Sequence, residues 1–275
     1  EGDIIWTSPI TFVASANCGL YCGAKVDFID IDPDTYNLCP QALEKKLVEA
    51  KKKGCLPKIV IPVHLSGQSC DMKSIHALSQ VYGFKIIEDA SHSVGSSYLD
   101  NPVGGCQYSD VTVFSFHPVK IITTGEGGMA LTNKKNLFKK INNLRTHGIT
   151  RKKNEMINPI NQPWYYQQID LGYNYRMTDI QAALGVSQMK KVDKFIESRN
   201  KIAKRYDKYL SDLPIQLPNI SNDCYSSFHL YIIRLKHQNS AKLRNKLYHS
   251  LLAEKIYTNI HYIPIHTQPY FKRMK

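Results

Sequence analysis

The sequence predicts an α/β fold with a mainly parallel sheet flanked by helices. Short apolar runs alternate with helical patterns over the first part of the chain, as in βαβ units. Several of these runs lead directly into polar residues, as strands do where they end at a binding edge. A composition of 43% hydrophobic and 21% charged residues over 275 positions is that of a globular protein with a sizeable core. A disordered tail or a coiled coil is therefore excluded.

The elements of the first part follow from apolar spacing and turn residues. Residues 59–63 are a largely β-branched run that predicts a strand, and residues 84–87 predict the next one. Between them, Asp71 occupies the N-cap position of a helix that Gly83 should end. Two further strands and a basic helix are predicted at residues 111–116, 129–132 and 134–144.

The second part begins with a long polar segment. Residues 150–169 contain an aromatic cluster and predict a long loop of functional importance. Thr178 and Gln181 have the spacing of a capping box, which predicts a helix that continues to about residue 210 and joins two domains. After prolines at 214 and 218, we expect a strand, a helix and an extended segment at residues 228–235, 241–253 and 256–265.

Charge is unevenly distributed along the chain. Of the net charge of +13, residues 1–120 contribute −3, from 10 basic and 13 acidic residues, and residues 121–275 contribute +16. Taken alone, this charge allows nucleic acid, an anionic membrane or an anionic small molecule as a partner. No apolar run approaches the roughly 18 residues that span a bilayer, and we expect a soluble, cytoplasmic protein.

The cysteines and histidines do not indicate a metal site. The seven cysteines are an odd number without C-x-x-C spacing, so we expect reduced thiols and neither a disulfide framework nor a zinc ribbon. His261 and His266 share one extended segment without acidic companions. The glycine-rich motifs of P-loop and Rossmann nucleotide sites are also missing from the sequence.

Two predicted strand ends carry the residues with the clearest chemical potential. Asp89 and His92 follow one strand, while Ser115 and Lys120 follow another. Pyridoxal 5′-phosphate uses such a set, because a lysine holds its aldehyde as a Schiff base and a carboxylate keeps its ring nitrogen protonated. Simpler explanations stay open: Asp89 could form a turn, Lys120 could be a surface lysine and His92 could be structural.

Five motifs follow one another in the first 190 residues. They are TFVASAN at 11–17, EDASHSVG at 88–95, FSFHPVK at 114–120, TGEGGM at 124–129 and GYNYRMTDIQAALG at 172–185. In this order they resemble the DegT/DnrJ/EryC1/StrS family of sugar aminotransferases. The resemblance implies a fold-type-I transferase that uses pyridoxal 5′-phosphate.

The resemblance also implies a role for each residue that matches a family motif. Lys120 matches the Schiff-base lysine, which also carries protons during transamination, and Asp89 matches the partner of the ring nitrogen. His92 matches a residue on the phenolic-oxygen side of the cofactor, Phe12 the ring that stacks on it, and Ser115 a phosphate ligand.

Further residues are implied to bind the substrate and a second subunit. Asn174 matches a residue offered to the phosphate of a neighbouring subunit, which implies a homodimer with shared active sites. His261 and Tyr262 lie in a segment similar to the substrate-binding part of members that act in pseudaminic acid biosynthesis. These members transfer an amino group from L-glutamate to C4 of a UDP-linked 4-keto-6-deoxy-N-acetylhexosamine.

The resemblance defines two expected domains. Residues 1–197 correspond to the large cofactor-binding domain without its N-terminal part, and residues 198–275 correspond to a smaller, truncated C-terminal α+β domain. The sequence starts at Glu1 without a methionine and ends in a basic stretch, so we expect it to be a fragment. Family members carry a phosphate-gripping loop ahead of the segment that begins here.

Four alternative functions share some of these sequence features. An aminotransferase of other regiochemistry would use the same residues, whereas a sugar dehydratase of this family carries histidine at the position of Lys120. A catalytically silent fragment would only bind a nucleotide sugar or a partner. A nucleic-acid binder would need aromatic and basic residues on one exposed face, and the segment around Tyr206 and Tyr209 is more simply a helix with a solvated flank.

Overall fold

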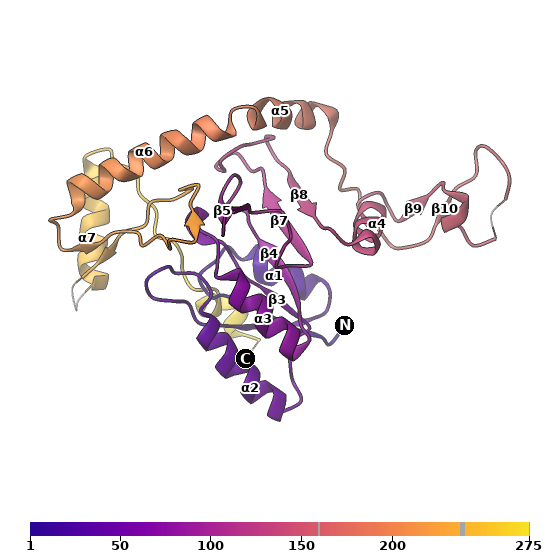
Figure 1. Cartoon of the computed structure of the whole chain (residues 1–275), viewed down its shortest axis with the longest axis horizontal. Helices are drawn as coiled ribbons and strands as arrows, with labels where there is room; N and C mark the ends of the chain where they lie inside the picture. Colours follow the sequence, from indigo (N-terminus) through magenta and orange to yellow (C-terminus); the bar gives the residue numbers. More distant parts are fainter. Residues whose placement is uncertain (159, 237–239, 275) are drawn as a thin grey trace.

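A six-stranded sheet forms the centre of the chain (Figure 1), in a computed structural model that describes residues 1–158, 160–236 and 240–274. The strand order is β2-β1-β3-β4-β7-β8. The first five strands are parallel and β8 runs antiparallel to β7, which confirms the predicted mainly parallel sheet. The strands are Ile4–Thr7 (β1), Lys25–Phe28 (β2), Ile59–Ile61 (β3), Lys85–Asp89 (β4), Val111–Ser115 (β7) and Gly128–Leu131 (β8).

Helices cover both faces of this sheet. Successive residues of a strand point to opposite faces, and Trp6 and Ile5 of β1 illustrate the two sides. Trp6 belongs to the main core, with the apolar residues of α2 (Pro40–Lys52) and α3 (Met72–Tyr82). Ile5 lies against α1 (Ala14–Tyr21), where a Cβ at Gly19 would come within 2.7 Å of Ile5 Cδ1.

The caps predicted for α3 are confirmed. The Asp71 carboxylate accepts a hydrogen bond from the Ser74 backbone N–H at 3.1 Å, which satisfies a donor of the first turn. Gly83 ends the helix with a φ of 80°, in the left-handed region that glycine adopts without strain. The 3-10 turn Leu65–Gly67 lies between β3 and α3.

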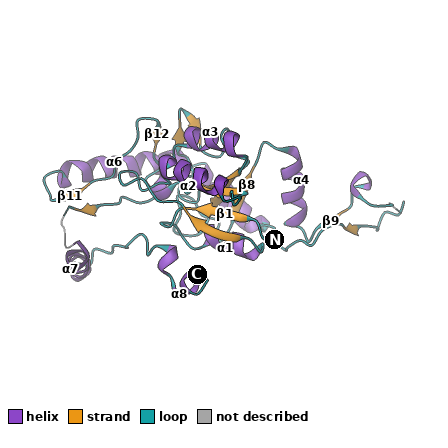
Figure 2. Cartoon of the chain, turned by 90° about the horizontal axis from the view of Figure 1, so that it is seen from below, coloured by secondary structure: helices purple, strands orange, loops and turns teal. Residues whose placement is uncertain are grey.

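The segment after β8 leaves the sheet. The predicted basic helix is confirmed as α4 (Lys135–Leu144). Beyond it, β9 (Ile149–Thr150) and β10 (Gln167–Gln168) form an antiparallel pair, with a 3-10 turn at Lys153–Glu155. The predicted loop at 150–169 is therefore an arm with short regular elements, and its residue 159 lies outside the described residues. Figures 1 and 2 both show this arm extending away from the sheet.

The single long helix predicted to begin at Thr178 is wrong in one respect. The capping box of Thr178 and Gln181 is present, but the helix breaks into α5 (Asp179–Met189) and α6 (Val192–Leu210). The break separates two environments, because the side chain of Ile180 on α5 is 85% exposed whereas that of Ile196 on α6 is 2% exposed.

The C-terminal part is only partly as predicted. The strand predicted at 228–235 is wrong over most of its length, because only β13 (Arg234–Leu235) forms, paired with β11 (Ile215–Gln216). Phe228 has a φ of 45°, which a strand cannot accommodate. The helix predicted at 241–253 is confirmed as α7 (Ser240–Ala253). The chain then runs without regular structure to a 3-10 turn at Ile265–Thr267 and α8 (Pro269–Lys272).

A small sheet joins the two predicted domains. Strand β12 (Cys224–Tyr225) pairs with β5 (Ser97–Tyr98), which also pairs with β6 (Asn101–Pro102). The domain boundary at residue 197 stays a prediction. At this sheet, β12 of the second predicted domain pairs with β5 of the first.

The seven cysteines all carry free thiols, as the sequence predicts. Among the helices of the described residues, none combines the length and the apolar character needed to cross a membrane.

Candidate active site

The carboxyl ends of β4 and β7 bring the predicted lysine and carboxylate together. Asp89 is the last residue of β4 and pairs in register with Val113 of β7, and Lys120 follows β7 in a turn. Burial lowers the pKa of Lys120, while the nearby carboxylate of Asp89 opposes that change. A half-buried amine beside one carboxylate is therefore more easily deprotonated than a surface lysine.

Hydrogen bonds fix the orientation of the Asp89 carboxylate. Its Oδ1 accepts from the backbone N–H of Ser91 at 3.1 Å and from the Ser91 hydroxyl at 2.6 Å. Its Oδ2 accepts from the Ser15 hydroxyl at 2.6 Å. Ser15 in turn exchanges a hydrogen bond with Thr11, so the segment that carries Phe12 is tied to Asp89. The Phe12 side chain itself is 61% exposed, so a ligand can pack against its ring.

His92 is a buried, neutral imidazole beside Lys120. Its Nδ1 accepts a hydrogen bond from the backbone N–H of Ser66 at 3.2 Å, so the ring proton resides on Nε2. Burial, with the positive charge of Lys120 and the nearby His261, lowers the pKa of His92 to about 3. A charged form is therefore disfavoured throughout the physiological range.

The C-terminal segment reaches the same strand ends. The Ile265 backbone N–H donates to the Pro9 carbonyl at 2.9 Å, and the buried Ile265 side chain packs with residues of α1 and α8. This contact brings His261 and Tyr262 to the site. Burial and Lys120 lower the pKa of His261, and burial and Asp89 raise the pKa of Tyr262. The buried Nδ1 of His261 has no hydrogen-bond partner among the described residues.

Two of the predicted site residues, Ser115 and Asn174, are less closely connected to the rest of the site. Ser115 ends β7 next to the site, and its hydroxyl accepts from the backbone N–H of His117 at 3.4 Å. Asn174 is exposed, and its backbone forms an isolated bridge with Thr146 near the base of the arm. Its described contacts do not join it to Asp89, His92 or Lys120 within this chain.

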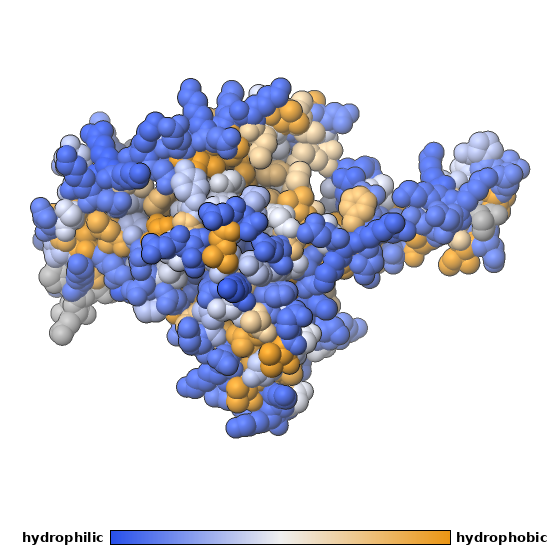
Figure 3. All heavy atoms as spheres, viewed as in Figure 1, coloured by the Kyte–Doolittle hydropathy of each residue, from blue (hydrophilic) through white to orange (hydrophobic). Residues whose placement is uncertain are grey.

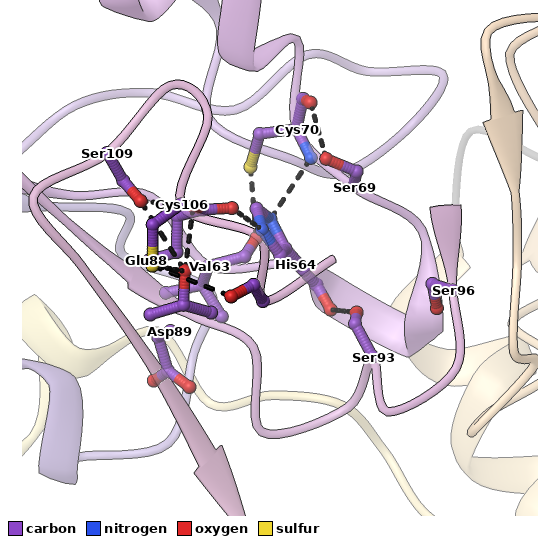
Figure 4. Close-up of polar contacts among 12 residues, drawn as sticks. Val63, His64, Ser69, Cys70, Glu88, Asp89, Ser93, Ser96, Cys106 and Ser109 are labelled. Carbon is purple, nitrogen blue, oxygen red and sulfur yellow. Dashed lines mark hydrogen bonds and ion pairs between the residues drawn. The ribbon is translucent and has the colours of Figure 1, made fainter. Parts of the chain in front are cut away.

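A buried polar network lies behind Asp89 on the other side of β4 (Figure 4). Glu88 accepts hydrogen bonds from His64 Nε2 at 2.7 Å, from the Thr112 hydroxyl at 2.9 Å and from the Ser109 hydroxyl. Burial raises the pKa of Glu88, but these hydrogen bonds outweigh burial and hold the pKa below its usual range. The His64 backbone N–H also donates to the Asp89 carbonyl at 3.0 Å, which joins the network to the strand end.

Four residues of this region were missed by the sequence analysis: Ser15, His64, Glu88 and His229. Glu88 and Ser15 lie inside the quoted motifs, so an unexplained polar residue within an apolar context was an available signal for both. His64 directly follows the predicted strand at 59–63, as Glu88 follows the one at 84–87. His229 carries no local signal, because its position depends on a loop contact between residues 135 or more apart in sequence.

Residues 1–275 match the sequence profile of the DegT/DnrJ/EryC1/StrS aminotransferase family. A UDP-4-amino-4,6-dideoxy-N-acetyl-β-L-altrosamine transaminase of Campylobacter jejuni is 39% identical over 277 residues, covering 98% of this chain and 68% of the relative. The spore coat polysaccharide biosynthesis protein SpsC of Bacillus subtilis is 36% identical over 274 residues, covering 99% of this chain and 68% of the relative.

Solved structures show the same likeness. Helicobacter pylori PseC, an aminotransferase involved in the biosynthesis of pseudoaminic acid, superposes with a TM-score of 0.88 at 32% identity, covering 99% of this chain and 68% of that one. Spr1654 of Streptococcus pneumoniae, in its pyridoxal-phosphate form, superposes with a TM-score of 0.84 at 28% identity, covering 99% of this chain and 70% of that one. The fold is therefore that of the pyridoxal-phosphate-dependent aminotransferases.

The described residues fit that cofactor. A carboxylate has about four lone-pair positions, and Asp89 uses three of them within the chain, so one position on Oδ2 stays available to a pyridinium N–H. Lys120 supplies an amine of lowered pKa next to that carboxylate. Phe12 presents an exposed ring beside the same strand ends.

Proposed function

Since the chain belongs to the DegT/DnrJ/EryC1/StrS aminotransferase family, we propose that its complete protein transfers an amino group from L-glutamate to C4 of a UDP-linked 4-keto-6-deoxy-N-acetylhexosamine. The observation that carries the proposal is the half-buried Lys120 beside a fixed Asp89 carboxylate. The similarity to the Campylobacter jejuni transaminase supports the substrate class.

Lys120 is the proposed catalytic residue. Pyridoxal 5′-phosphate, when bound, supplies the electron sink and carries the amino group between the two substrates. The Nζ of Lys120 removes the proton from Cα of the amino donor and later delivers one to the sugar carbon that receives the amino group. The lowered pKa favours this role, because a general base works best when its pKa lies near the operating pH.

The residues around Lys120 orient the cofactor. Asp89 would hold a protonated ring nitrogen, and the Ser15 and Ser91 hydrogen bonds keep its carboxylate in position. Phe12 would stack on the ring. His92 would donate its Nε2 proton to the phenolic oxygen without bringing a positive charge to the site. Ser115 would contact the phosphate.

The roles of His261, Tyr262 and Asn174 toward the substrate and the second subunit are proposed in the same way. His261 and Tyr262 lie at the site, and the Nδ1 of His261, which has no hydrogen-bond partner in the described part of the chain, would bind a sugar group. We propose a homodimer in which Asn174 contributes to the site of the neighbouring subunit. The net charge of +16 over residues 121–275 favours a dianionic nucleotide sugar, and we expect the enzyme to act in the cytoplasm.

The test uses the complete protein with Lys120→Ala. We expect transamination of the UDP-linked keto sugar to fall by about 10²- to 10⁴-fold, and the absorbance of the lysine-bound cofactor to disappear. Lys140→Ala, at an exposed position of α4, is the matched control and should keep both. Wild-type turnover in the Lys120→Ala variant would contradict the assignment.

A second measurement separates the proposed reaction from the alternatives. The purified complete protein is given L-glutamate and UDP-linked 4-keto and 3-keto sugars in turn, and the aminated carbon is identified by NMR. Amination at C4 supports the proposal, amination at C3 indicates the other regiochemistry, and binding without any product indicates a catalytically silent protein.

A further inference from the structure

A second imidazole lies on His92. The rings of His92 and His229 have their centroids 4.3 Å apart with an interplanar angle of 41°. His229 lies on the irregular segment that follows β12, 137 positions further along the chain than His92. Its Nδ1 is buried without a hydrogen-bond partner among the described residues. His229 is not among the site residues predicted from the sequence.

Backbone contacts hold the segment of His229 against the His92 loop. The Ser227 hydroxyl donates to the His92 carbonyl at 2.9 Å, and the Ser227 N–H donates to the Gly67 carbonyl at 3.1 Å. The Leu230 N–H donates to the carbonyl of Ser66 at 3.2 Å, and Ser66 is the residue whose N–H donates to His92 Nδ1. The turn at residues 66–67 therefore holds both His92 and His229 in place.

Two features show how closely these segments approach. Gly67 has a φ of +104°, and a Cβ there would lie 2.5 Å from the Ser227 hydroxyl and 2.9 Å from the Phe228 nitrogen. From the other side, Arg199 of α6 donates to the carbonyls of Phe228 at 3.0 Å and His229 at 3.3 Å. His229 is thus fixed between the strand ends and α6.

The groups that face this histidine pair are cationic or titratable. Lys120 and His261 lie near His92, and Arg199 lies near His229 in addition. Burial and these neighbours lower the pKa of His229 to about 2. A proton on either imidazole would meet repulsion from Lys120, and burial withholds the water that would solvate it.

We infer that His229 is a positioning residue of the active site, whose ring covers His92 and keeps it neutral and in one orientation beside Lys120. The inference rests on the proposed roles of Lys120 and His92. A neutral imidazole can donate its N–H to an oxygen of the cofactor without adding a charge that would repel the protonated lysine.

The test follows the imidazole of His92 in the complete protein loaded with pyridoxal 5′-phosphate. Histidine labelled with ¹³C at Cε1 gives an NMR signal for each ring, and His92→Gln identifies that of His92. In the wild type we expect no titration of this signal between pH 8 and pH 5. In His229→Ala we expect its midpoint to rise by about two units or more, toward the ordinary value of about 6.5.

Two variants serve as controls. His229→Phe keeps a ring over His92 without a titratable nitrogen, so the His92 signal should stay untitrated above pH 5. His249→Ala, at an exposed position of α7, should also leave it unchanged. The absorbance of the bound cofactor, recorded over the same pH range, should change its midpoint in His229→Ala and in neither control.

The outcomes are distinct. An untitrated His92 signal in a folded His229→Ala variant would overturn the inference, and so would a shift in His229→Phe as large as in His229→Ala. If His229→Ala does not fold, His229→Leu removes the aromatic cover at similar volume and is measured in its place. A normal spectrum in Lys120→Ala would contradict the proposed function itself, whichever result the His229 variants give.

Discussion

The strand-end region, residues 1–124, and the arm region, residues 125–191, differ in how their side chains are buried. The strand-end region holds the main core and the network of Glu88 and His64. Among the described residues of the arm region, only Gly148 and Thr150 are buried. The side chains of the candidate active site are therefore held in place by contacts within the chain, whereas the apolar side chains of the arm region are left exposed.

The exposed side chains of the arm region are large and apolar. Leu171 is 88% exposed, Ile180 85% and Trp164 69%. Figure 3 shows hydrophobic atoms gathered on the surface at α5, a helix with apolar residues on most sides. Such a helix is normally buried, so this surface is consistent with the proposed homodimer.

The largest effect on stability is expected for Glu88→Ala in the complete protein. It leaves the buried donors of His64 and Thr112 and the half-buried hydroxyl of Ser109 without their acceptor, and we expect the free energy of unfolding to fall by about 3–5 kcal/mol. Urea unfolding measures the change. The control is Glu126→Ala in the arm region, whose side chain is 73% exposed and whose loss should cost about 0.5 kcal/mol or less. Equal losses of unfolding free energy in the two variants would contradict the difference in burial between the two regions.

Gly67→Ala and Gly125→Ala compare two glycines of positive φ, one in each region. Both glycines have a left-handed φ, but a Cβ at Gly67 meets Ser227 and Phe228, whereas a Cβ at Gly125 meets no atom within 4 Å. We expect about 1 kcal/mol of destabilisation at Gly125 and about 2–4 kcal/mol at Gly67. Thermal and urea unfolding of both variants test this, and a smaller loss at Gly67 would show that the Ser227 contact is loose.

Thr178→Ala tests a contact that the arm region makes locally. The Thr178 side chain accepts from the backbone N–H of Gln181, and its loss should cost about 1 kcal/mol, since it removes one N-cap hydrogen bond. Thr178→Ser keeps the acceptor and should be close to neutral. An equal loss in both variants would indicate that the methyl group, rather than the hydroxyl, stabilises the start of α5.

The smallest effect on the subunit is expected for Ile180→Ser. Because this side chain is exposed in the chain, its replacement should change the stability of the isolated subunit by about 0.5 kcal/mol or less. If the homodimer covers α5, the same substitution should weaken dimerisation, which analytical ultracentrifugation measures. Unchanged dimerisation would remove α5 from the proposed interface, and Lys190→Ser at the exposed end of this helix is the control.

Local signals account for the correct part of the sequence analysis. The caps at Asp71, Gly83 and Thr178 depend on hydrogen bonds between residues three or four positions apart, so the sequence contains all of the necessary information. The placement of Asp89 and Lys120 depends on strands that end where polar residues begin. The rule that parallel strands present their carboxyl ends at one edge then brings the two residues together.

The errors occurred where distant contacts override local preference. The break between α5 and α6 is not marked by glycine or proline; it separates a helix with an exposed Ile180 from one whose Ile196 enters a core with residues of the His92 loop and β7. The apolar run after Phe228 favours a strand locally, but Ser227 and Leu230 bond to the turn at 66–67 instead. Tertiary hydrogen bonds of this kind outweigh a weak β-propensity.

By itself the sequence determined the α/β class, the family, and the pairing of a lysine with a carboxylate at the ends of parallel strands. It could do so because periodicity, capping and motif spacing are local properties. Only the tertiary structure decided that His229 covers His92, that Glu88 and His64 support Asp89 from behind, and that His261 and Tyr262 reach the same edge. These contacts join segments far apart in the chain, and their burial sets the protonation of the imidazoles, which spacing along a sequence does not encode.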